Sequence, residues 1–189
     1  DQSLKAEAVG IPIYHVKAFN WIRLYSWFKY GFNDSKKVPQ GEFSKDGILD
    51  HVASFLRGNF FIPDARISWV KPAIKKCIEI INENKINKVI TTGPPHSTHL
   101  IGLKLKSSLN INWIADFRDP WSDLFYLKSF YRLPFAKKKD KKLETDVLSN
   151  ADCILTTTSK NFHKELQSKI TRKQKFYQIY NGFDFELFN

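Results

Sequence analysis

Apolar and polar positions in the second half of the chain alternate between two periods. Short apolar runs predict strands at residues 88–92, 112–116, 153–156 and 176–180. Between them, apolar positions recur every three or four residues, which predicts helices at residues 97–106, 137–148 and 160–167. Strands that alternate with helices indicate an α/β domain, a parallel sheet of βαβ units flanked by helices.

The first half of the chain is less regular. Residues 67–82 form an amphipathic pattern with Pro72 near its start, where a helix tolerates a missing N–H. We further expect a short helix at 48–57, a strand at 11–16, and an exposed loop at 29–46, which is rich in Lys, Gly and Asn.

Composition narrows the class of protein and of partner. Hydrophobic residues make up 42% of the 189 residues, which is too apolar for a disordered chain. The net charge of +11 favours anionic partners such as nucleic acid, anionic lipid or phosphorylated small molecules. Cys77 and Cys153 both lie in apolar stretches, so we interpret them as buried thiols in a reducing compartment. No Cys/His spacing indicates a metal site, and no apolar run reaches the roughly 18 residues of a membrane span.

Candidate chemistry follows the predicted strands. In an open parallel sheet, ligands bind beyond the carboxyl ends of the strands. Glycine or polar residues follow all four predicted strands, so we expect their loops to meet at one edge of the sheet. These loops begin at Gly93, Asp116, Thr156 and Asn181.

The loop after the first strand is Gly93-Pro94-Pro95-His96-Ser97. Gly93 permits a sharp turn or the close approach of a ligand to the backbone. His96 is placed to contact a ligand hydroxyl or to shuttle a proton, with a capping or packing role as the alternative. Ser97 or Thr98 is expected to cap the following helix.

The next loop places two carboxylates around a guanidinium. Arg118 is expected to keep both Asp116 and Asp119 ionised, and ionised carboxylates accept hydrogen bonds from sugar hydroxyls. The alternative is a structural group of ion pairs that holds the loop. Asn181-Gly182 fits a tight turn with positive φ.

Residues 19–32 mix seven aromatic residues with the basic residues Arg23 and Lys29, and Lys17 lies just before them. This composition suits a membrane interface, where rings lie at headgroup level and cations meet anionic lipid. A helix that packs its aromatic rings on the domain core is the alternative. The lysine-rich run at 137–142 is interpreted as the solvated side of a helix.

Four sequence blocks resemble bacterial glycosyltransferases of family 4. They are Gly58-Asn59-Phe60-Phe61-Ile62-Pro63-Asp64, Thr91-Thr92-Gly93-Pro94-Pro95-His96-Ser97-Thr98-His99-Leu100, Trp113-Ile114-Ala115-Asp116-Phe117-Arg118-Asp119-Pro120-Trp121 and Asn181-Gly182-Phe183-Asp184. The resemblance implies the GT-B fold, two Rossmann-like domains that face each other across a cleft, and metal-independent transfer with retention of configuration. It implies that residues 1–189 are part of the N-terminal, acceptor-side domain. The opening strand with its Gly-rich loop and the C-terminal donor domain would then lie outside this chain.

The resemblance also implies roles for particular residues. Gly93, His96, Arg118 and Asp119 would line the acceptor side of the cleft, and Asn181 and Gly182 would lie near the hinge between the domains. We expect Asp116 to bind substrate and Asp119 to orient the acceptor hydroxyl as the catalytic residue. Retaining chemistry needs no protein base, because the departing phosphate can accept the proton.

The expected partners follow from the same resemblance. They are a nucleotide-sugar donor, a glycan or lipid-linked acceptor of cell-surface polysaccharide synthesis, and an anionic membrane surface, with no cofactor and no nucleic acid. The expected location is the cytoplasm or the inner face of the cytoplasmic membrane. Three alternatives stay open: another GT-B enzyme such as a sugar-nucleotide epimerase, a basic nucleic-acid-binding module, and a non-catalytic surface-assembly protein. Against the second, the basic residues are scattered along the chain.

Overall fold

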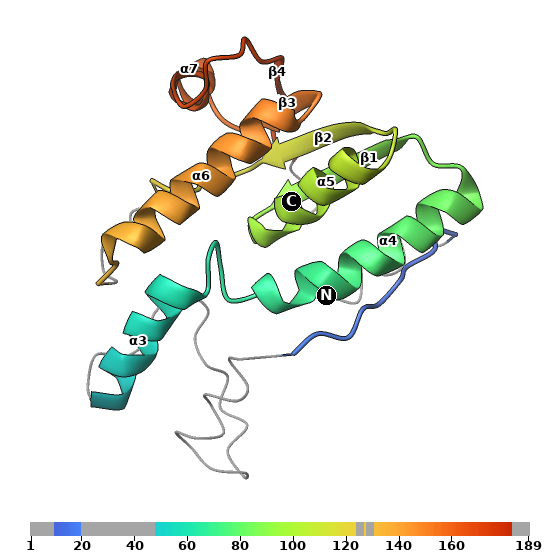
Figure 1. Ribbon diagram of the computed structural model, residues 1–189. Coiled ribbons are helices and arrows are strands. Elements are labelled where there is room, and N and C mark those ends of the chain that lie inside the picture. The colour runs from blue at the N-terminus through green and yellow to red at the C-terminus, as the bar shows by residue number, and fades with distance from the viewer. Residues whose placement is uncertain (1–9, 20–47, 124–126, 128–130, 183–189) are drawn as a thin grey trace, which may run out of the picture.

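The structure is a computed structural model that describes residues 10–19, 48–123, 127 and 131–182. Helices and strands alternate from β1 onward (Figure 1). In chain order the elements are α3 (Ile48–Phe60), the 3-10 helix η1 (Ile67–Trp69), α4 (Val70–Asn84), β1 (Lys88–Gly93), α5 (Ser97–Ser108), β2 (Asn112–Phe117), α6 (Pro134–Asn150), β3 (Cys153–Thr156), α7 (Lys160–Ser168) and β4 (Phe176–Gln178).

The four strands form one parallel sheet in the order β1-β2-β3-β4. In the register, Gly93 lies opposite Phe117, and Phe117 lies opposite Thr156. The strands therefore end at the same edge of the sheet. This confirms the predicted Rossmann-like parallel sheet and the meeting of the loops after its strands.

Residues that alternate along β2 make the centre of the main core. Trp113, Ala115 and Phe117 are completely buried and pack against α6, where Val147 and Leu148 are equally buried. Gly102 of α5 lies directly against the Trp113 indole, at a distance that leaves no room for a Cβ atom. Glycine at this position therefore lets α5 approach the sheet closely.

A second core lies between α4 and α5. Val70, Ala73 and Ile81 of α4 are buried against Ile101 and Leu105 of α5. This confirms the amphipathic side predicted for residues 67–82. The first turn of that segment is the 3-10 helix η1. Directly after α4, Lys85 adopts the left-handed conformation with φ of 52°.

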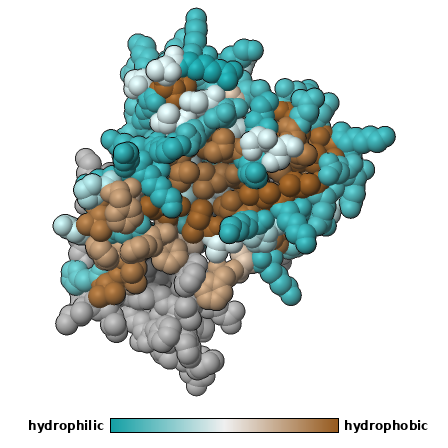
Figure 2. Space-filling view, viewed as in Figure 1, coloured by the Kyte–Doolittle hydropathy of each residue, from teal (hydrophilic) through white to brown (hydrophobic). Residues whose placement is uncertain are grey.

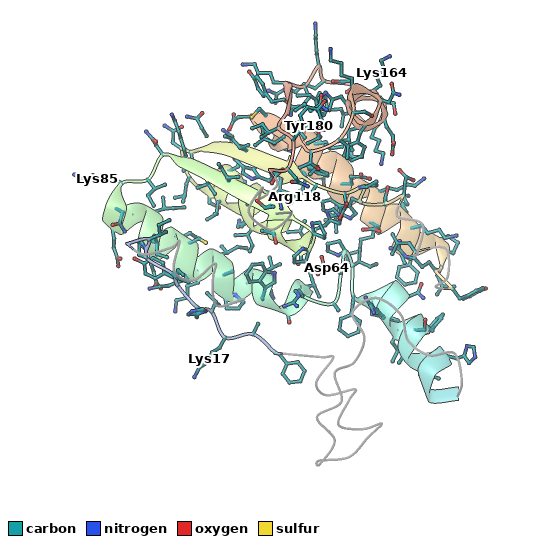
Figure 3. The ribbon with its side chains drawn as sticks, turned by 180° about the vertical axis from the view of Figure 1, so that it is seen from behind. Lys17, Asp64, Lys85, Arg118, Lys164 and Tyr180 are labelled. Atoms are coloured by element: carbon teal, nitrogen blue, oxygen red, sulfur yellow. The ribbon has the colours of Figure 1, made fainter. Side chains whose placement is uncertain are left out.

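The other side of the sheet is open in the part of the chain that the structure describes. Ile90 on β1, Tyr177 on β4 and Ile179 beyond it alternate with inward-facing neighbours, and all three are exposed. Figure 3 views the molecule from behind, with the sheet in front of α5. The covering helices thus lie on one side of the described sheet.

Two sequence predictions about strands need correction. Residues 11–16 form no strand. The 10–19 segment runs along η1 and α4: the Ser68 hydroxyl of η1 donates to the Phe19 carbonyl at 2.6 Å, and the Lys76 ammonium of α4 lies over the Tyr14 ring. The strand predicted to reach Tyr180 ends at Gln178, because its neighbour β3 already ends at Thr156.

Two further predictions lie mostly outside the described residues. They are the loop at 29–46 and the aromatic and basic stretch at 19–32, of which only Phe19 is described. Among the described residues, no helix is both long enough and apolar enough to cross a membrane.

Candidate functional site

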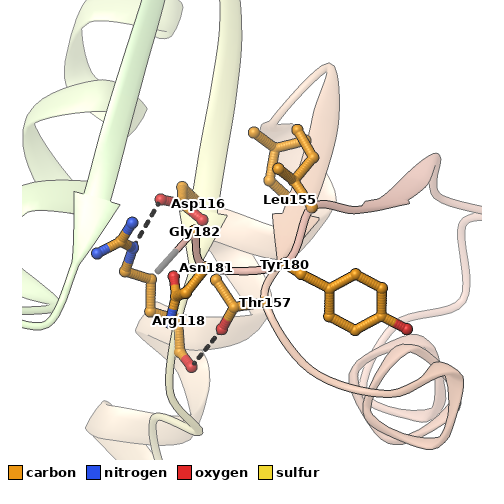
Figure 4. A pocket seen from close by; sticks show the side chains of 8 residues that line it. Asp116, Arg118, Leu155, Thr157, Tyr180, Asn181 and Gly182 are labelled. Atoms are coloured by element: carbon orange, nitrogen blue, oxygen red, sulfur yellow. Dashed lines mark hydrogen bonds and ion pairs between the residues drawn. The ribbon is translucent and has the colours of Figure 1, made fainter. Parts of the chain in front are cut away.

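A pocket of about 490 Å³ lies at the carboxyl edge of the sheet, at the ends of β2, β3 and β4 (Figure 4). Ligand sites in parallel sheets occupy this position, and its volume lies within the range typical of small-molecule sites. The residues that line it are Asp116, Arg118, Leu155, Thr157, Ile179, Tyr180, Asn181 and Gly182. Four of the residues expected at a site from the sequence therefore come together here: Asp116, Arg118, Asn181 and Gly182.

Asp116 and Arg118 form an ion pair within the pocket. The guanidinium Nε of Arg118 lies 3.4 Å from Oδ2 of Asp116. The Asp116 side chain is mostly shielded from solvent, whereas that of Arg118 is 53% exposed. The pair therefore offers a ligand both carboxylate acceptors and guanidinium donors.

The backbone of Arg118 connects two neighbouring strand ends. Its N–H donates to the Gly93 carbonyl at 3.2 Å, and its own carbonyl accepts from the Thr157 hydroxyl at 3.3 Å (Figure 4). These bonds extend the connection between β1, β2 and β3 past the last paired residues. They hold the residue that carries the guanidinium at a defined place on the edge.

The segment after β4 supplies the remaining wall. The phenol ring of Tyr180 is exposed, and Asn181 and Gly182 follow it in the lining. Gly182 does not adopt a positive φ, so the tight turn predicted at Asn181-Gly182 is wrong in that respect. The Asn181 amide lies near Arg118 in Figure 4.

His96 lies away from this pocket and is buried, with 4% of its surface exposed. Its ring stacks on Trp121 at a centroid distance of 5.0 Å, and its Nε2 donates to the Pro120 carbonyl at 3.1 Å. Neighbouring His99 is also buried and stacks on Phe117 at 4.7 Å. Both imidazoles thus belong to an aromatic layer of the core.

Hydrogen bonds and burial determine the charge of the two rings. The Thr91 hydroxyl accepts from the Trp113 indole and also bonds to Nδ1 of His99 at 2.9 Å, and the tautomer of the ring determines the direction of that second bond. Burial, with the nearby His96, lowers the pKa of His99 to about 3. Burial also lowers the pKa of His96, although the Pro120 carbonyl acts in the opposite direction. Both rings are therefore neutral near pH 7.

Gly93 lies against these two rings. A Cβ atom there would come within 2.6 Å of Nε2 of His99 and 3.1 Å of Nδ1 of His96. The sequence predicted that glycine at this position serves a turn or the approach of a ligand. The structure adds a packing reason, because the histidine layer leaves no room for a side chain.

Asp119 follows Arg118 but does not line the pocket. Its side chain is exposed, and it makes no hydrogen bond or ion pair with any other described residue. The predicted pairing of Arg118 with both carboxylates is therefore present for Asp116 alone. Trp121, three residues after Arg118, is 1% exposed and packs in the core.

Two buried carboxylates of α6 hold the loop that begins at Trp121. Asp140 accepts from the Trp121 indole at 2.8 Å and lies 2.9 Å from the Arg132 guanidinium. One turn further, Glu144 accepts from the Ser122 hydroxyl at 2.5 Å and pairs with Lys169. Burial raises the pKa of Glu144, whereas the Lys169 ammonium acts to lower it. Residues outside the predicted Asp-Phe-Arg-Asp block thus hold this loop.

Asp64 is a residue that sequence reasoning missed. One of its carboxylate oxygens accepts from the Ser97 backbone N–H at 2.7 Å, and the other accepts from the Ser97 hydroxyl at 2.9 Å. The residue before α5 is His96, which makes no capping bond with its side chain. The prediction that Ser97 or Thr98 caps this helix is therefore wrong: a carboxylate 33 residues away in the sequence takes that place.

Asn59 plays a comparable part for the segment before α6. Its side-chain amide donates to the Tyr131 carbonyl at 2.8 Å, and its oxygen accepts from the Leu133 N–H at 2.7 Å. Nearby, Arg132 donates to the Gly58 carbonyl at 3.0 Å. The block from Gly58 to Asp64, which contributed to the family resemblance, therefore connects α3 to two distant parts of the chain. The sequence singled out this block only through that resemblance and did not predict these contacts.

The described residues contain no group of three or more His, Cys, Asp or Glu side chains that could hold a metal ion. Cys77 and Cys153 are free thiols of intermediate burial rather than the fully buried thiols expected. Burial raises the pKa of both.

The chain was compared with protein-family models, curated proteins and solved structures. None of the three comparisons finds a match. The resemblance to glycosyltransferases therefore depends on the four sequence blocks, and the site is interpreted from its own chemistry.

Proposed function

We propose that this chain is the acceptor-side part of a retaining glycosyltransferase of the GT-B type, which transfers a sugar from a nucleotide donor. The observation that carries the proposal is the pocket at the carboxyl edge, where the Asp116–Arg118 pair, the Thr157 hydroxyl and the Asn181 amide converge. Sugar hydroxyls both donate and accept hydrogen bonds, so a mixed set of carboxylate, guanidinium and amide groups suits them.

The exposed ring of Tyr180 supports the same ligand class. Pockets for small molecules combine apolar surface with a few placed polar groups. Here Tyr180, Leu155 and Ile179 provide the apolar part of the lining, beside the polar groups. A pyranose ring has apolar C–H faces and a polar rim, so it matches both parts of this surface.

Binding of simple glycans tests the pocket directly. Saturation-transfer NMR with a panel of mono- and disaccharides should detect weak binding to the chain, and Arg118→Gln should weaken it by about tenfold or more, or roughly 1.4 kcal/mol. The matched control is Arg66→Gln, because Arg66 is also exposed but lies before α4, away from the pocket.

Two results would contradict the proposal. One is the absence of saturation transfer, and so of binding, for all sugars in the panel. The other is equal sugar binding by the Arg118→Gln and Arg66→Gln variants. Micromolar binding of a nucleotide sugar would show that the chain carries the donor side instead.

Asp119 is proposed to orient the acceptor hydroxyl during transfer. In a polypeptide that joins this chain to a donor domain, Asp119→Asn should lower turnover by more than about tenfold, roughly 1.4 kcal/mol of transition-state stabilisation. Its melting temperature should stay unchanged, because the side chain is exposed and unpaired among the described residues. Asp146→Asn, at a surface ion pair on α6, is the control. Unchanged turnover in Asp119→Asn would mean that another group orients the acceptor hydroxyl. Asp116 is the carboxylate that lines the pocket.

A further inference from the structure

The exposed side of α3 carries an apolar stripe. Val52, Leu56 and Phe60 follow one another at intervals of four residues, which places them along one side of the helix. They are 49%, 44% and 60% exposed. Next to Phe60 in the last turn of α3, Asn59 is 1% exposed and bonds to the segment before α6, which joins this end of the helix to the rest of the domain.

The beginning of α6 enlarges this stripe. Phe135 is 50% exposed, and its ring lies 6.2 Å from that of Phe60. Tyr131 is 75% exposed and stacks on Phe55 of α3 at 6.3 Å. Figure 2 shows apolar side chains gathered at the lower left, over the region of α3 and the start of α6 seen in Figure 1. We call Val52, Leu56, Phe60, Tyr131 and Phe135 the α3–α6 patch.

Lysines follow the patch directly along α6. Lys137, Lys138 and Lys139 are exposed, and none of them forms an ion pair with another described residue. Lys138 and Lys139 lie one helical turn beyond Phe135, and the acidic residues of the next turns, Asp140 and Glu144, are buried. As far as the described residues go, the region around the patch therefore presents positive charge that no carboxylate pairs with.

We propose that the α3–α6 patch and its lysines dock the protein on an anionic lipid surface. Exposed phenylalanine, leucine and valine side chains insert at the boundary between headgroups and acyl chains, while lysines next to them contact lipid phosphates. The lysines beside the patch favour this partner. An apolar protein surface would bind the rings alone, and the lysines would lose their hydration against it without gaining a counter-charge. The net charge of +11 adds long-range attraction to the same surface. The proposal is independent of sugar transfer, since it uses none of the pocket residues.

Co-sedimentation with lipid vesicles tests this proposal. The chain should bind vesicles of phosphatidylcholine with about 30% phosphatidylglycerol and fail to bind pure phosphatidylcholine, and binding should weaken between about 0.1 M and about 0.5 M salt. Phe60→Ser combined with Phe135→Ser should weaken the binding by tenfold or more. The control pair Ile90→Ser and Tyr177→Ser removes apolar side chains of similar exposure from the open side of the sheet and should bind normally.

A second set of variants separates local from overall charge. Lys137→Gln, Lys138→Gln and Lys139→Gln together lower the net charge from +11 to +8, and so does the set Lys164→Gln, Lys173→Gln and Lys175→Gln, which are also exposed. The first set should weaken binding at least tenfold more than the second. Thermal melting checks that each variant is folded, and Leu56→Gln replaces the double phenylalanine variant if that variant unfolds.

Three results would overturn the proposal. They are equal sedimentation with neutral and anionic vesicles, sedimentation with neither, and equal losses in the two lysine sets. The last would indicate attraction by overall charge without a docking surface. If the natural partner is an acidic protein and not a membrane, the chain should sediment with neither kind of vesicle.

Discussion

Replacing Asp140 by alanine is expected to lower the free energy of unfolding by about 3–5 kcal/mol, the usual cost of breaking a buried ion pair from one side. The Arg132 side chain is 6% exposed and that of Asp140 is 1% exposed, so the guanidinium would stay buried without its counter-charge. The Trp121 indole would lose its acceptor at the same time. Denaturation with urea at neutral pH measures the change.

The same helix provides the control for this substitution. Asp146 also pairs with a basic residue, Lys142, but that lysine is 72% exposed and the pair lies on the surface. Asp146→Ala should therefore cost no more than about 0.5 kcal/mol. Asp140→Asn should fall between the two, because it keeps an acceptor for Trp121 and removes the charge. Equal losses for Asp140→Ala and Asp146→Ala would mean that Arg132 finds another partner when Asp140 is absent.

Acidification is expected to destabilise the protein through His99. The pKa of His99 is about 3 in the folded chain, against about 6.5 for an unfolded histidine. Between these values the unfolded chain binds a proton that the folded chain does not. The stability from the neutral ring is therefore complete above about pH 6.5 and is lost progressively as the pH falls towards 3. At pH 5 the loss amounts to about 2 kcal/mol relative to pH 8.

Other groups modify this pH profile. The lowered pKa values of His96 and His163 add losses of the same sign, and so does the lowered pKa of Asp152 at more acidic pH. The raised pKa of Glu144 acts in the opposite direction nearer its own titration. Urea denaturation at several pH values should therefore be compared between the native chain and His99→Asn. Asparagine can exchange a hydrogen bond with the Thr91 hydroxyl but cannot titrate, so the variant should be less stable at pH 8 and have a flatter profile. His51→Asn, at an exposed position on α3, should keep the native profile. An unchanged slope in His99→Asn would contradict the assignment.

The sheet and its helices could be predicted from the sequence because their signals are local. Apolar residues at two different periods mark the strands and helices of the sheet domain, and the bounds of β3 match the prediction at both ends. The end of β4 could not be predicted in this way, since it depends on where the neighbouring strand stops. The segment at 11–16 has the composition of a strand, but it packs along a helix instead.

The candidate site shows the same division. The prediction that residues directly after the strands meet at one edge is confirmed for Asp116, Arg118, Asn181 and Gly182, which line one pocket. The topology of a parallel sheet alone determines that they share this edge. Position could not distinguish them from His96, which also follows a strand. The burial of His96 is determined by Trp121, which stacks on its ring, and by the Pro120 carbonyl, which accepts from it. These contacts come from 24 and 25 residues away, where no periodic pattern indicates them.

The capping of α5 by Asp64 bears on where this folding unit begins. Secondary structure suggests a boundary just before α4 or β1, since the βαβ units start there. Such a cut would remove Asp64 from the first turn of α5 and Asn59 from the segment before α6. The loss of either side chain leaves a backbone N–H group without its acceptor, in a part of the chain that is otherwise well packed. The hydrogen bonds therefore place the start of the cooperative unit before Gly58, so that α3 belongs to the sheet domain rather than to a separate leading segment.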